Sequence, residues 1–172
     1  MNTPVALITG ASRGLGRALA AGLAREGLTH DGQTHERLSL IIDARNAAAL
    51  QEAAEQLRAA GATVTAISGD VTDPAHRAAL LRAAEAAGRL DLLVNNAGTL
   101  GASPLPALAD YPPADLRTAF EANVIAPIAL IQLMLPLLRA SGGAATASDG
   151  GPRTIGLGRP GRGTDVPRRR ST

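Results

Sequence analysis

Short apolar runs alternate along the chain with longer segments in which apolar residues recur at helical spacing. The short runs predict four strands, at 4–9, 38–44, 63–68 and 91–94. The longer segments predict helices at 15–25, at 46–61 with Asn46 as cap, at 74–87 with Asp73 as cap, and at 114–139 with a bend or break near Pro127 and Pro136. The polar stretch 29–37 predicts a loop. Strands that alternate with helices indicate an α/β fold with a doubly wound parallel sheet.

This pattern ends near residue 141. Beyond it Gly, Pro, Arg and Thr dominate, and neither a strand nor a helix period survives. The sequence therefore predicts one domain over residues 1–140 and an irregular or disordered basic tail over 141–172. With no strand expected in the tail, the fourth strand would be an unpaired sheet edge and the helix at 125–138 would lose part of its cover. Exposed apolar area of that kind predicts aggregation.

Charge is distributed unevenly. The pI of about 10.3 suggests nucleic-acid binding. Residues 1–140, however, contain 11 Arg against 13 acidic residues, whereas the tail contains six Arg against Asp149 and Asp165. The basic character belongs to the tail, so no nucleic-acid partner is expected.

Other partner classes are disfavoured by composition. The chain has no Cys, and His30, His35 and His76 lack the spacing of metal ligands, so no metal is expected. No uninterrupted apolar run approaches the ~20 residues that span a bilayer. The first residues lack the basic region of a signal peptide. The expectation is a cytoplasmic protein without a membrane partner.

A glycine-rich turn joins the first strand to the first helix, with the sequence TGASRGLG over residues 9–16. Glycines there let the backbone approach a pyrophosphate, and the helix behind offers unpaired N–H groups. Glycines at such a corner can also serve turning alone. After a strand and within a chain of strand–helix units, the turn predicts a dinucleotide site, with the candidates Gly10, Ser12, Arg13, Gly14, Leu15 and Gly16.

The spacing TGxxxGxG resembles the fingerprint of the classical short-chain dehydrogenase/reductase family, and three later features match it in order. Asp70-Val71 ends the third strand, where family members contact adenine. The run Asn95 to Gly98 (NNAG) follows the fourth strand and matches the family's turn beside the cofactor, through Asn96, Ala97 and Gly98. Asn123 stands where the family has the Asn that supports its proton relay. Each feature alone has a structural alternative, such as a cap or a turn.

The resemblance covers residues 4–139. It implies a Rossmann-type fold that is incomplete, with about four strands in the order 3-2-1-4. It also implies an oxidoreductase that uses NAD or NADP to interconvert a small-molecule carbonyl and an alcohol. Family members commonly pair through helices, so a homo-oligomer is compatible with the sequence.

The choice of cofactor depends on charge near the ribose. An acid after the second strand favours NAD, and an Arg favours the 2′-phosphate of NADP. Aligning the strand end on Arg45 brings this side chain and Arg13 toward the phosphate, which favours NADP. A slip of one residue would bring Asp43 to the ribose and favour NAD.

The family's catalytic pair, Tyr-x-x-x-Lys, is absent. There is no Lys in the chain, and its only Tyr, Tyr111, precedes two prolines upstream of Asn123. Ser148 lies near the family's Ser position but follows a poor strand sequence, so the role is not assigned to it. Asn123 is then the only catalytic candidate.

The sequence of the tail suggests why the catalytic pair is absent. If each codon starts at the third base of the present one, codons at 163–164 can encode Tyr and those at 167–172 can encode Lys-Ala-Ala-Leu-Asp. We predict a frameshift between about residues 139 and 163. The alternatives are a naturally divergent tail, a non-catalytic nucleotide-binding module, and a non-functional fragment.

Overall fold

A parallel sheet forms the centre of the computed structural model, which describes residues 3–30, 33–35, 38–147 and 154–156. The strands are β1 (Val5–Ile8), β4 (Ser39–Ala44), β5 (Thr63–Ser68), β6 (Leu92–Asn95), β7 (Ala144–Ala147) and β8 (Thr154–Gly156). Their order is β5-β4-β1-β6-β7-β8, and all neighbours are parallel except β7 and β8. The predicted α/β class and the order 3-2-1-4 of the first four main strands are confirmed.

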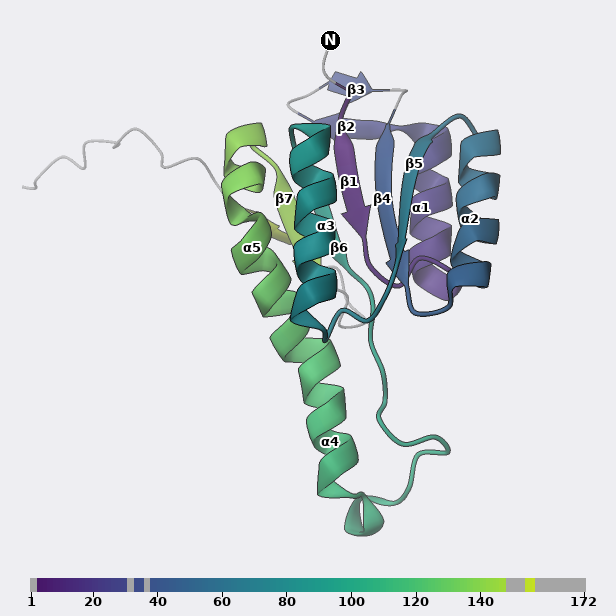
Figure 1. Cartoon of the computed structure of the whole chain (residues 1–172), viewed down its shortest axis with the longest axis vertical. Helices are drawn as coiled ribbons and strands as arrows, with labels where there is room; N and C mark the ends of the chain where they lie inside the picture. The colour runs from purple at the N-terminus through teal and green to yellow at the C-terminus, as the bar shows by residue number, and fades with distance from the viewer. Residues whose placement is uncertain (1–2, 31–32, 36–37, 148–153, 157–172) are drawn as a thin grey trace, which may run out of the picture.

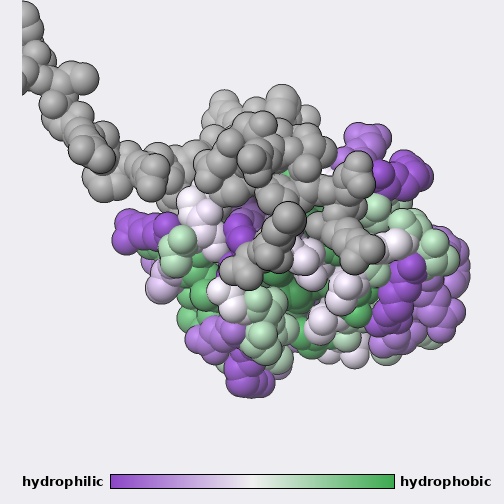
Figure 2. All heavy atoms as spheres, turned by 90° about the horizontal axis from the view of Figure 1, so that it is seen from above, coloured by the Kyte–Doolittle hydropathy of each residue, from purple (hydrophilic) through white to green (hydrophobic). Residues whose placement is uncertain are grey.

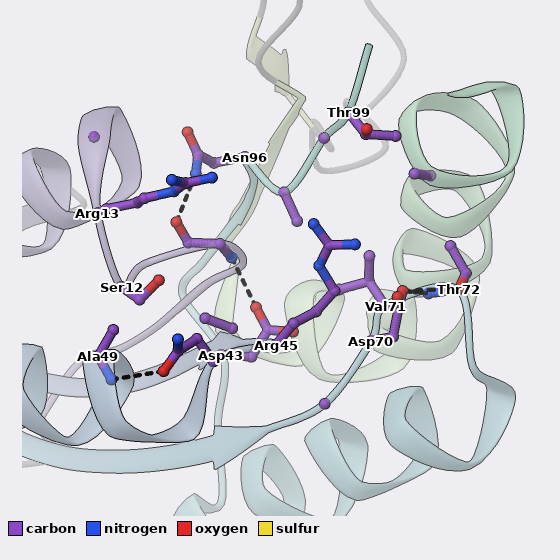
Figure 3. Close-up of a pocket in the computed structure, with 18 of the residues that line it drawn as sticks. Ser12, Arg13, Asp43, Arg45, Ala49, Asp70, Val71, Thr72, Asn96 and Thr99 are labelled. Atoms are coloured by element: carbon purple, nitrogen blue, oxygen red, sulfur yellow. Dashed lines mark hydrogen bonds between the residues drawn. The ribbon is translucent and has the colours of Figure 1, made fainter. Parts of the chain in front are cut away.

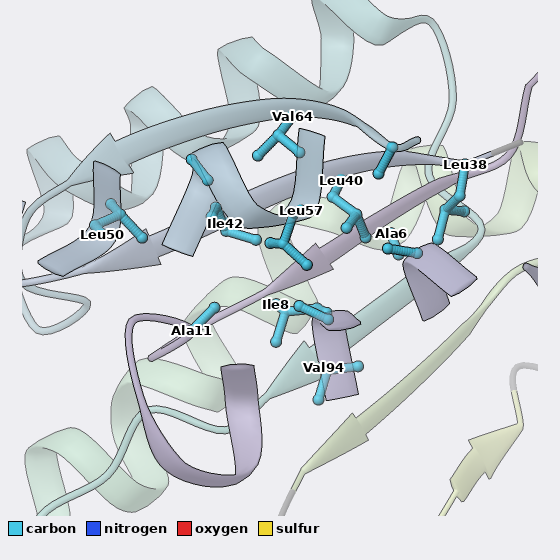
Figure 4. Packing of buried hydrophobic residues seen from close by; sticks show 14 of the residues in the cluster. Ala6, Ile8, Ala11, Leu38, Leu40, Ile42, Leu50, Leu57, Val64 and Val94 are labelled. Atoms are coloured by element: carbon cyan, nitrogen blue, oxygen red, sulfur yellow. The ribbon is translucent and has the colours of Figure 1, made fainter. Parts of the chain in front are cut away.

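Helices cover both faces of the sheet (Figure 1). One face carries α1 (Gly14–Glu26) and α2 (Ala47–Ala59), and the other carries α3 (Pro74–Ala87) and α5 (Ala126–Ser141). Successive residues of β1 supply the two cores in turn, because side chains alternate across a strand. Ala6 and Ile8 pack under α1 and α2 (Figure 4), whereas Val5 and Leu7 pack under α3 and α5.

The helices begin where the sequence predicts caps. Asn46 Oδ1 accepts a hydrogen bond from the Ala49 N–H at 3.0 Å, and Asp73 Oδ1 accepts one from the Ala75 N–H at 2.8 Å. Each bond satisfies a donor that the first turn leaves unpaired. Viewed from above (Figure 2), hydrophilic side chains gather on the outer side of the molecule over α2. The exposed hydrophilic residues of α2 are Gln51, Glu52, Glu55, Gln56 and Arg58.

A fifth main strand corrects the sequence prediction. β7 pairs in parallel with β6 from Leu92–Ala144 to Asn95–Ala147, so β6 is no sheet edge. It lies within 141–172, which had been expected to be irregular, and β8 adds an antiparallel strand beside it. Its sequence, AATA, has weak strand propensity. Backbone pairing and complete burial of Ala145 decide the structure there instead.

The predicted loop at 29–37 contains a small antiparallel pair. β2 (Leu28–His30) pairs with β3 (Gln33–His35), in the register Leu28–His35 and His30–Gln33. This two-stranded unit is separate from the main sheet. The sequence lacked the alternating apolar pattern that would have predicted it.

The last long helix is interrupted near Pro127, as predicted. α4 (Pro113–Phe120) leads into a π-helical segment, η2 (Glu121–Ile125), and then into α5. The Ala126 N–H bonds to the Glu121 carbonyl, one residue further back than in an α-helix. Pro127 follows at once and has no N–H to continue the α-helical ladder. Pro136 lies inside α5 without ending it.

The stretch Pro113–Ser141 is 29 residues long and, by length and composition alone, apolar enough to cross a membrane. The sequence predicts no membrane span, because no uninterrupted apolar run is long enough, so the length and composition of this helix differ from that prediction. One row of α5 is buried against the sheet: Ala126, Leu130, Met134 and Leu138. Ile125 at the end of η2, and Ile128 and Leu133 in α5, are exposed.

Candidate functional site

The glycine-rich turn lies at the carboxyl ends of the central strands. Gly10 and Gly14 have φ of +68° and +58°, a conformation in which a side chain would be strained. A Cβ on Gly10 would also lie 2.9 Å from the Ala97 Cα. Both glycines are therefore required by backbone geometry, and the turn packs directly against the segment after β6.

Asn96 fastens that segment to the turn. Its Nδ2 donates to the carbonyls of Thr9, at 2.9 Å, and Gly10, at 3.2 Å. In return the Thr9 Oγ1 accepts from the backbone N–H groups of Asn96 and Ala97, each at 3.0 Å. Gly16 permits this arrangement, because a Cβ there would lie 2.4 Å from Asn96 Nδ2. These four bonds hold the two loops as one unit.

A cavity of about 800 Å³ opens above the strand ends (Figure 3). Of the predicted site residues, ten line it: Gly10, Ser12, Arg13, Gly14, Arg45, Asp70, Val71, Asn96, Ala97 and Gly98. They come from four separate loops of the sheet's carboxyl edge. The crevice at that edge is where open α/β sheets bind ligands.

Three predicted residues do not line the cavity. Leu15 is 58% exposed and is not part of the lining. Gly16 lies behind the turn, beneath Asn96. Asn123 lies in η2 and binds the backbone of Thr99 in both directions, with Oδ1 accepting from the N–H at 2.9 Å and Nδ2 donating to the carbonyl at 2.7 Å. Asn123 thus positions the loop after Gly98, and its place in a proton relay stays a prediction.

Two arginines line the cavity. Arg45 follows β4 and Arg13 immediately precedes α1, and both line the cavity. Asp43 also contributes to the lining, but its side chain is almost completely buried. Its Oδ1 accepts from the Gly10 N–H at 2.8 Å, and its Oδ2 lies 2.9 Å from His76 Nε2. Both oxygens are occupied by protein groups, which disfavours the alternative in which Asp43 faces the ribose.

Asp70, near Arg45 in the cavity lining, is held as a carboxylate (Figure 3). The Thr72 backbone N–H, at 2.9 Å, and hydroxyl, at 2.8 Å, donate to Oδ1. The backbone bond contributes most to lowering the pKa of Asp70, burial opposes it, and Arg45 and His76 add smaller lowering effects. This acceptor next to Val71 suits a ligand that presents hydrogen-bond donors.

Sequence reasoning missed several residues of the site. Thr72 and Thr118 line the cavity and belong to no motif recognised in the sequence, whereas Thr99 follows the NNAG turn and Ala122 directly precedes Asn123. His76 was considered only as a metal ligand, whereas it supports the cavity floor through Asp43. The sequence contains no pattern that predicts this contact between an Asp just before the end of one strand and a His in the first turn of a later helix.

Tyr111 has a structural role. Its hydroxyl donates to the Leu100 carbonyl and so closes the loop between β6 and α4. It does not line the cavity. Ser148, like the codons proposed to hide the Tyr and Lys, lies outside the described residues.

Comparison with known proteins gives the family. The family model for the short chain dehydrogenase matches residues 4–148. The rhamnolipid-biosynthesis 3-oxoacyl-[acyl-carrier-protein] reductase of Pseudomonas aeruginosa is 36% identical over 155 residues, which cover 90% of this chain and 54% of that protein. The 7alpha-hydroxysteroid dehydrogenase of Escherichia coli is 33% identical over 139 residues, covering 80% and 49%.

A solved structure agrees with the fold. The 7 alpha-hydroxysteroid dehydrogenase complexed with NADH and 7-oxo glycochenodeoxycholic acid superimposes with a TM-score of 0.70 at 32% identity, over 83% of this chain and 51% of that one. The chain belongs to the short chain dehydrogenase family. It spans about half the length of the curated relatives it matches. The family resemblance inferred from the motifs is confirmed.

Proposed function

We propose that this chain is the cofactor-binding part of an NADP-dependent oxidoreductase that interconverts a small-molecule carbonyl and an alcohol. The observation that carries the choice of NADP is the charge at the ribose end of the cavity. Arg13 and Arg45 are available there, while both oxygens of Asp43 are bound. Guanidinium groups bind phosphate oxygens in a fork, and a carboxylate at this place would repel the 2′-phosphate.

The residues present fit a dinucleotide. The cavity joins the α1 N-terminus, which has no acidic residue in its first turn, to a carboxylate acceptor at Asp70. The helix N–H groups suit the pyrophosphate, and Asp70 with Val71 suits the adenine end. When bound, the nicotinamide supplies the hydride that reduces the carbonyl. The chain's own residues orient it: the Asn96 bonds fix the turn, and Asn123 holds the Thr99 backbone beside Gly98.

A melt of the purified chain with NADPH, NADH or neither tests this proposal. We expect stabilisation by NADPH at lower concentration than by NADH. The variant Arg45→Ala should weaken NADPH binding about tenfold, because one charge-assisted contact to phosphate is lost, and should leave NADH binding nearly unchanged. Arg82→Ala, which removes the same charge from the exposed outer side of α3, is the matched control. Equal losses in both variants would refute the assignment of Arg45.

Turnover is expected to be absent in this chain, since it has no Lys to complete the family's catalytic pair. Stabilisation by NADPH without turnover would also fit the alternative of a non-catalytic nucleotide-binding module. The encoding DNA separates the two. Codons 163–168 that spell Tyr-x-x-x-Lys in the shifted frame would support a parent oxidoreductase, and codons that cannot spell it would refute the frameshift.

Self-association and location stay predictions. The exposed apolar residues Leu116, Phe120 and Ile125 follow one another along α4 and η2, which supports pairing through these helices. Sedimentation of the chain would test it, and a monomer at micromolar concentration would refute it. The cytoplasmic location stays an expectation from the sequence.

A further inference from the structure

Asp43 and His76 form a buried pair beneath the ribose end of the cavity. Asp43 is the last residue but one of β4, and His76 lies in the first turn of α3; their side chains are 1% and 6% exposed. A carboxylate oxygen only accepts, so the imidazole Nε2 donates across the 2.9 Å to Oδ2. The other oxygen, Oδ1, accepts from Gly10. A single carboxylate therefore links α3 to the glycine-rich turn.

The fold makes a specific place for the imidazole. Gly69, directly after β5, leaves the space in which the His76 ring lies, since a Cβ there would be 2.1 Å from Nδ1. The Gly69 N–H in turn donates to the Ala44 carbonyl at 3.1 Å, next to Asp43. The ring is thus confined between the ends of β4 and β5, with Nε2 directed at the carboxylate.

This geometry matters because Asp43 also lines the cavity, two residues before Arg45. Without the His76 donor, Oδ2 would be a buried acceptor with no hydrogen-bond partner, which is costly. The carboxylate would gain by turning toward the cavity, where water and ribose hydroxyls can donate to it. There it would favour a ribose with free hydroxyls, repel a 2′-phosphate and compete for Arg45.

We propose that His76 is a positioning residue that determines the preference for NADPH over NADH, by holding the Asp43 carboxylate on Gly10 and away from the ribose. This inference rests on the proposed function. It assigns a part in selectivity to a residue outside the cavity, in addition to Arg13 and Arg45 in its lining.

Dissociation constants for NADPH and NADH, measured by calorimetry on the full chain, test the proposal. His76→Leu removes the donor, and His76→Gln is the matched control, because its terminal amide can donate from nearly the position of Nε2. We expect H76L to lower the ratio of NADPH to NADH affinity about tenfold, the effect of losing one hydrogen bond to a charged group. H76Q should keep the ratio within about twofold of the parent.

A second background shows whether the effect passes through Asp43. In Asp43→Asn the amide oxygen can still accept from Gly10, but it carries no charge. The addition of H76L to D43N should therefore leave the ratio within about twofold of D43N alone. If H76L does not fold, Gly69→Ala displaces the same ring, and the same fall in ratio is expected.

The outcomes are distinct. A parent that binds neither nucleotide overturns both this inference and the proposed function. A parent that prefers NADPH, with H76L and H76Q showing the parent ratio or weakening both nucleotides equally, overturns the inference alone. A fall in ratio that persists in the D43N background also overturns it, because the charge of Asp43 would then play no part.

Discussion

Two glycines of α1 provide an internally controlled test of how the turn is built. A Cβ on Gly16 would lie 2.6 Å from the Gly10 carbonyl oxygen and 2.4 Å from Asn96 Nδ2, whereas a Cβ on Gly22 would meet nothing within 4 Å. The same substitution, Gly→Ala, thus adds one methyl group to one helix in two surroundings. Only the substitution at Gly16 should disturb the site.

The magnitudes follow from those distances. Alanine in a helix is favoured over glycine by about 0.5–1 kcal/mol, so Gly22→Ala should stabilise the fold by that amount. At Gly16 the backbone carbonyl must retreat by about 0.8 Å to reach ordinary contact, an overpacking that costs about 1–3 kcal/mol. Displacing Asn96 also forfeits its two bonds to the turn, at about 1 kcal/mol each. Gly16→Ala should therefore be less stable than Gly22→Ala by at least about 2 kcal/mol.

Urea unfolding followed by circular dichroism measures the difference, and the melting temperature should separate the variants by about 4–8 °C. The NADPH-dependent shift gives a second, independent readout. It should be lost in Gly16→Ala, where the turn is displaced, and kept in Gly22→Ala. Equal stability of the two variants, or a full NADPH shift in Gly16→Ala, would refute the view that close packing of Asn96 on the turn forms the site.

Two further predictions concern stability. Asp73→Ala removes the cap of α3 and should cost about 1 kcal/mol in urea unfolding, without changing the NADPH shift, because Asp73 does not line the cavity. The pKa of Asp70 is lowered in the folded chain, so its contribution to stability is present above the ordinary carboxyl pKa and is lost as the pH falls below about 4. Asp70→Asn should flatten the fall in melting temperature over that acidic range; an unchanged profile would contradict the role of the Thr72 bonds.

Elements with a strong local signal were predictable from the sequence. The caps at Asn46 and Asp73 and the interruption before Pro127 follow from short-range chemistry, and the structure has all three. β7 could not be predicted, because its alanines become a strand only through pairing with β6, about fifty residues away in the sequence. Tertiary context of this kind overrides local propensity.

The site shows the same division. Gly10, Gly14 and Asn96 were found because their motif encodes a local turn and its close neighbour. The place of Asp43 was left open between two registers, and the structure decides it through Gly10 and His76, residues that precede and follow it by 33 positions each. The Asp43 carboxylate contacts a backbone N–H in the turn after β1 and a side chain of α3, and contacts of this kind leave no periodic pattern in the sequence.

The two cores are completed at different times during synthesis. All of the core under α1 and α2 except Val94 comes from residues 6–64, whereas the core under α3 and α5 needs residues up to Ala145. At about 5–20 residues per second, the ribosome takes on the order of ten seconds to synthesise the residues that separate the completion of the first core from that of the second. During that interval α3 is made first, and Val5, Leu7 and Ile41, on strands already covered on one side, lack the cover of α5 on the other. The nascent chain should therefore present a half-covered sheet to chaperones before α5 can close over it.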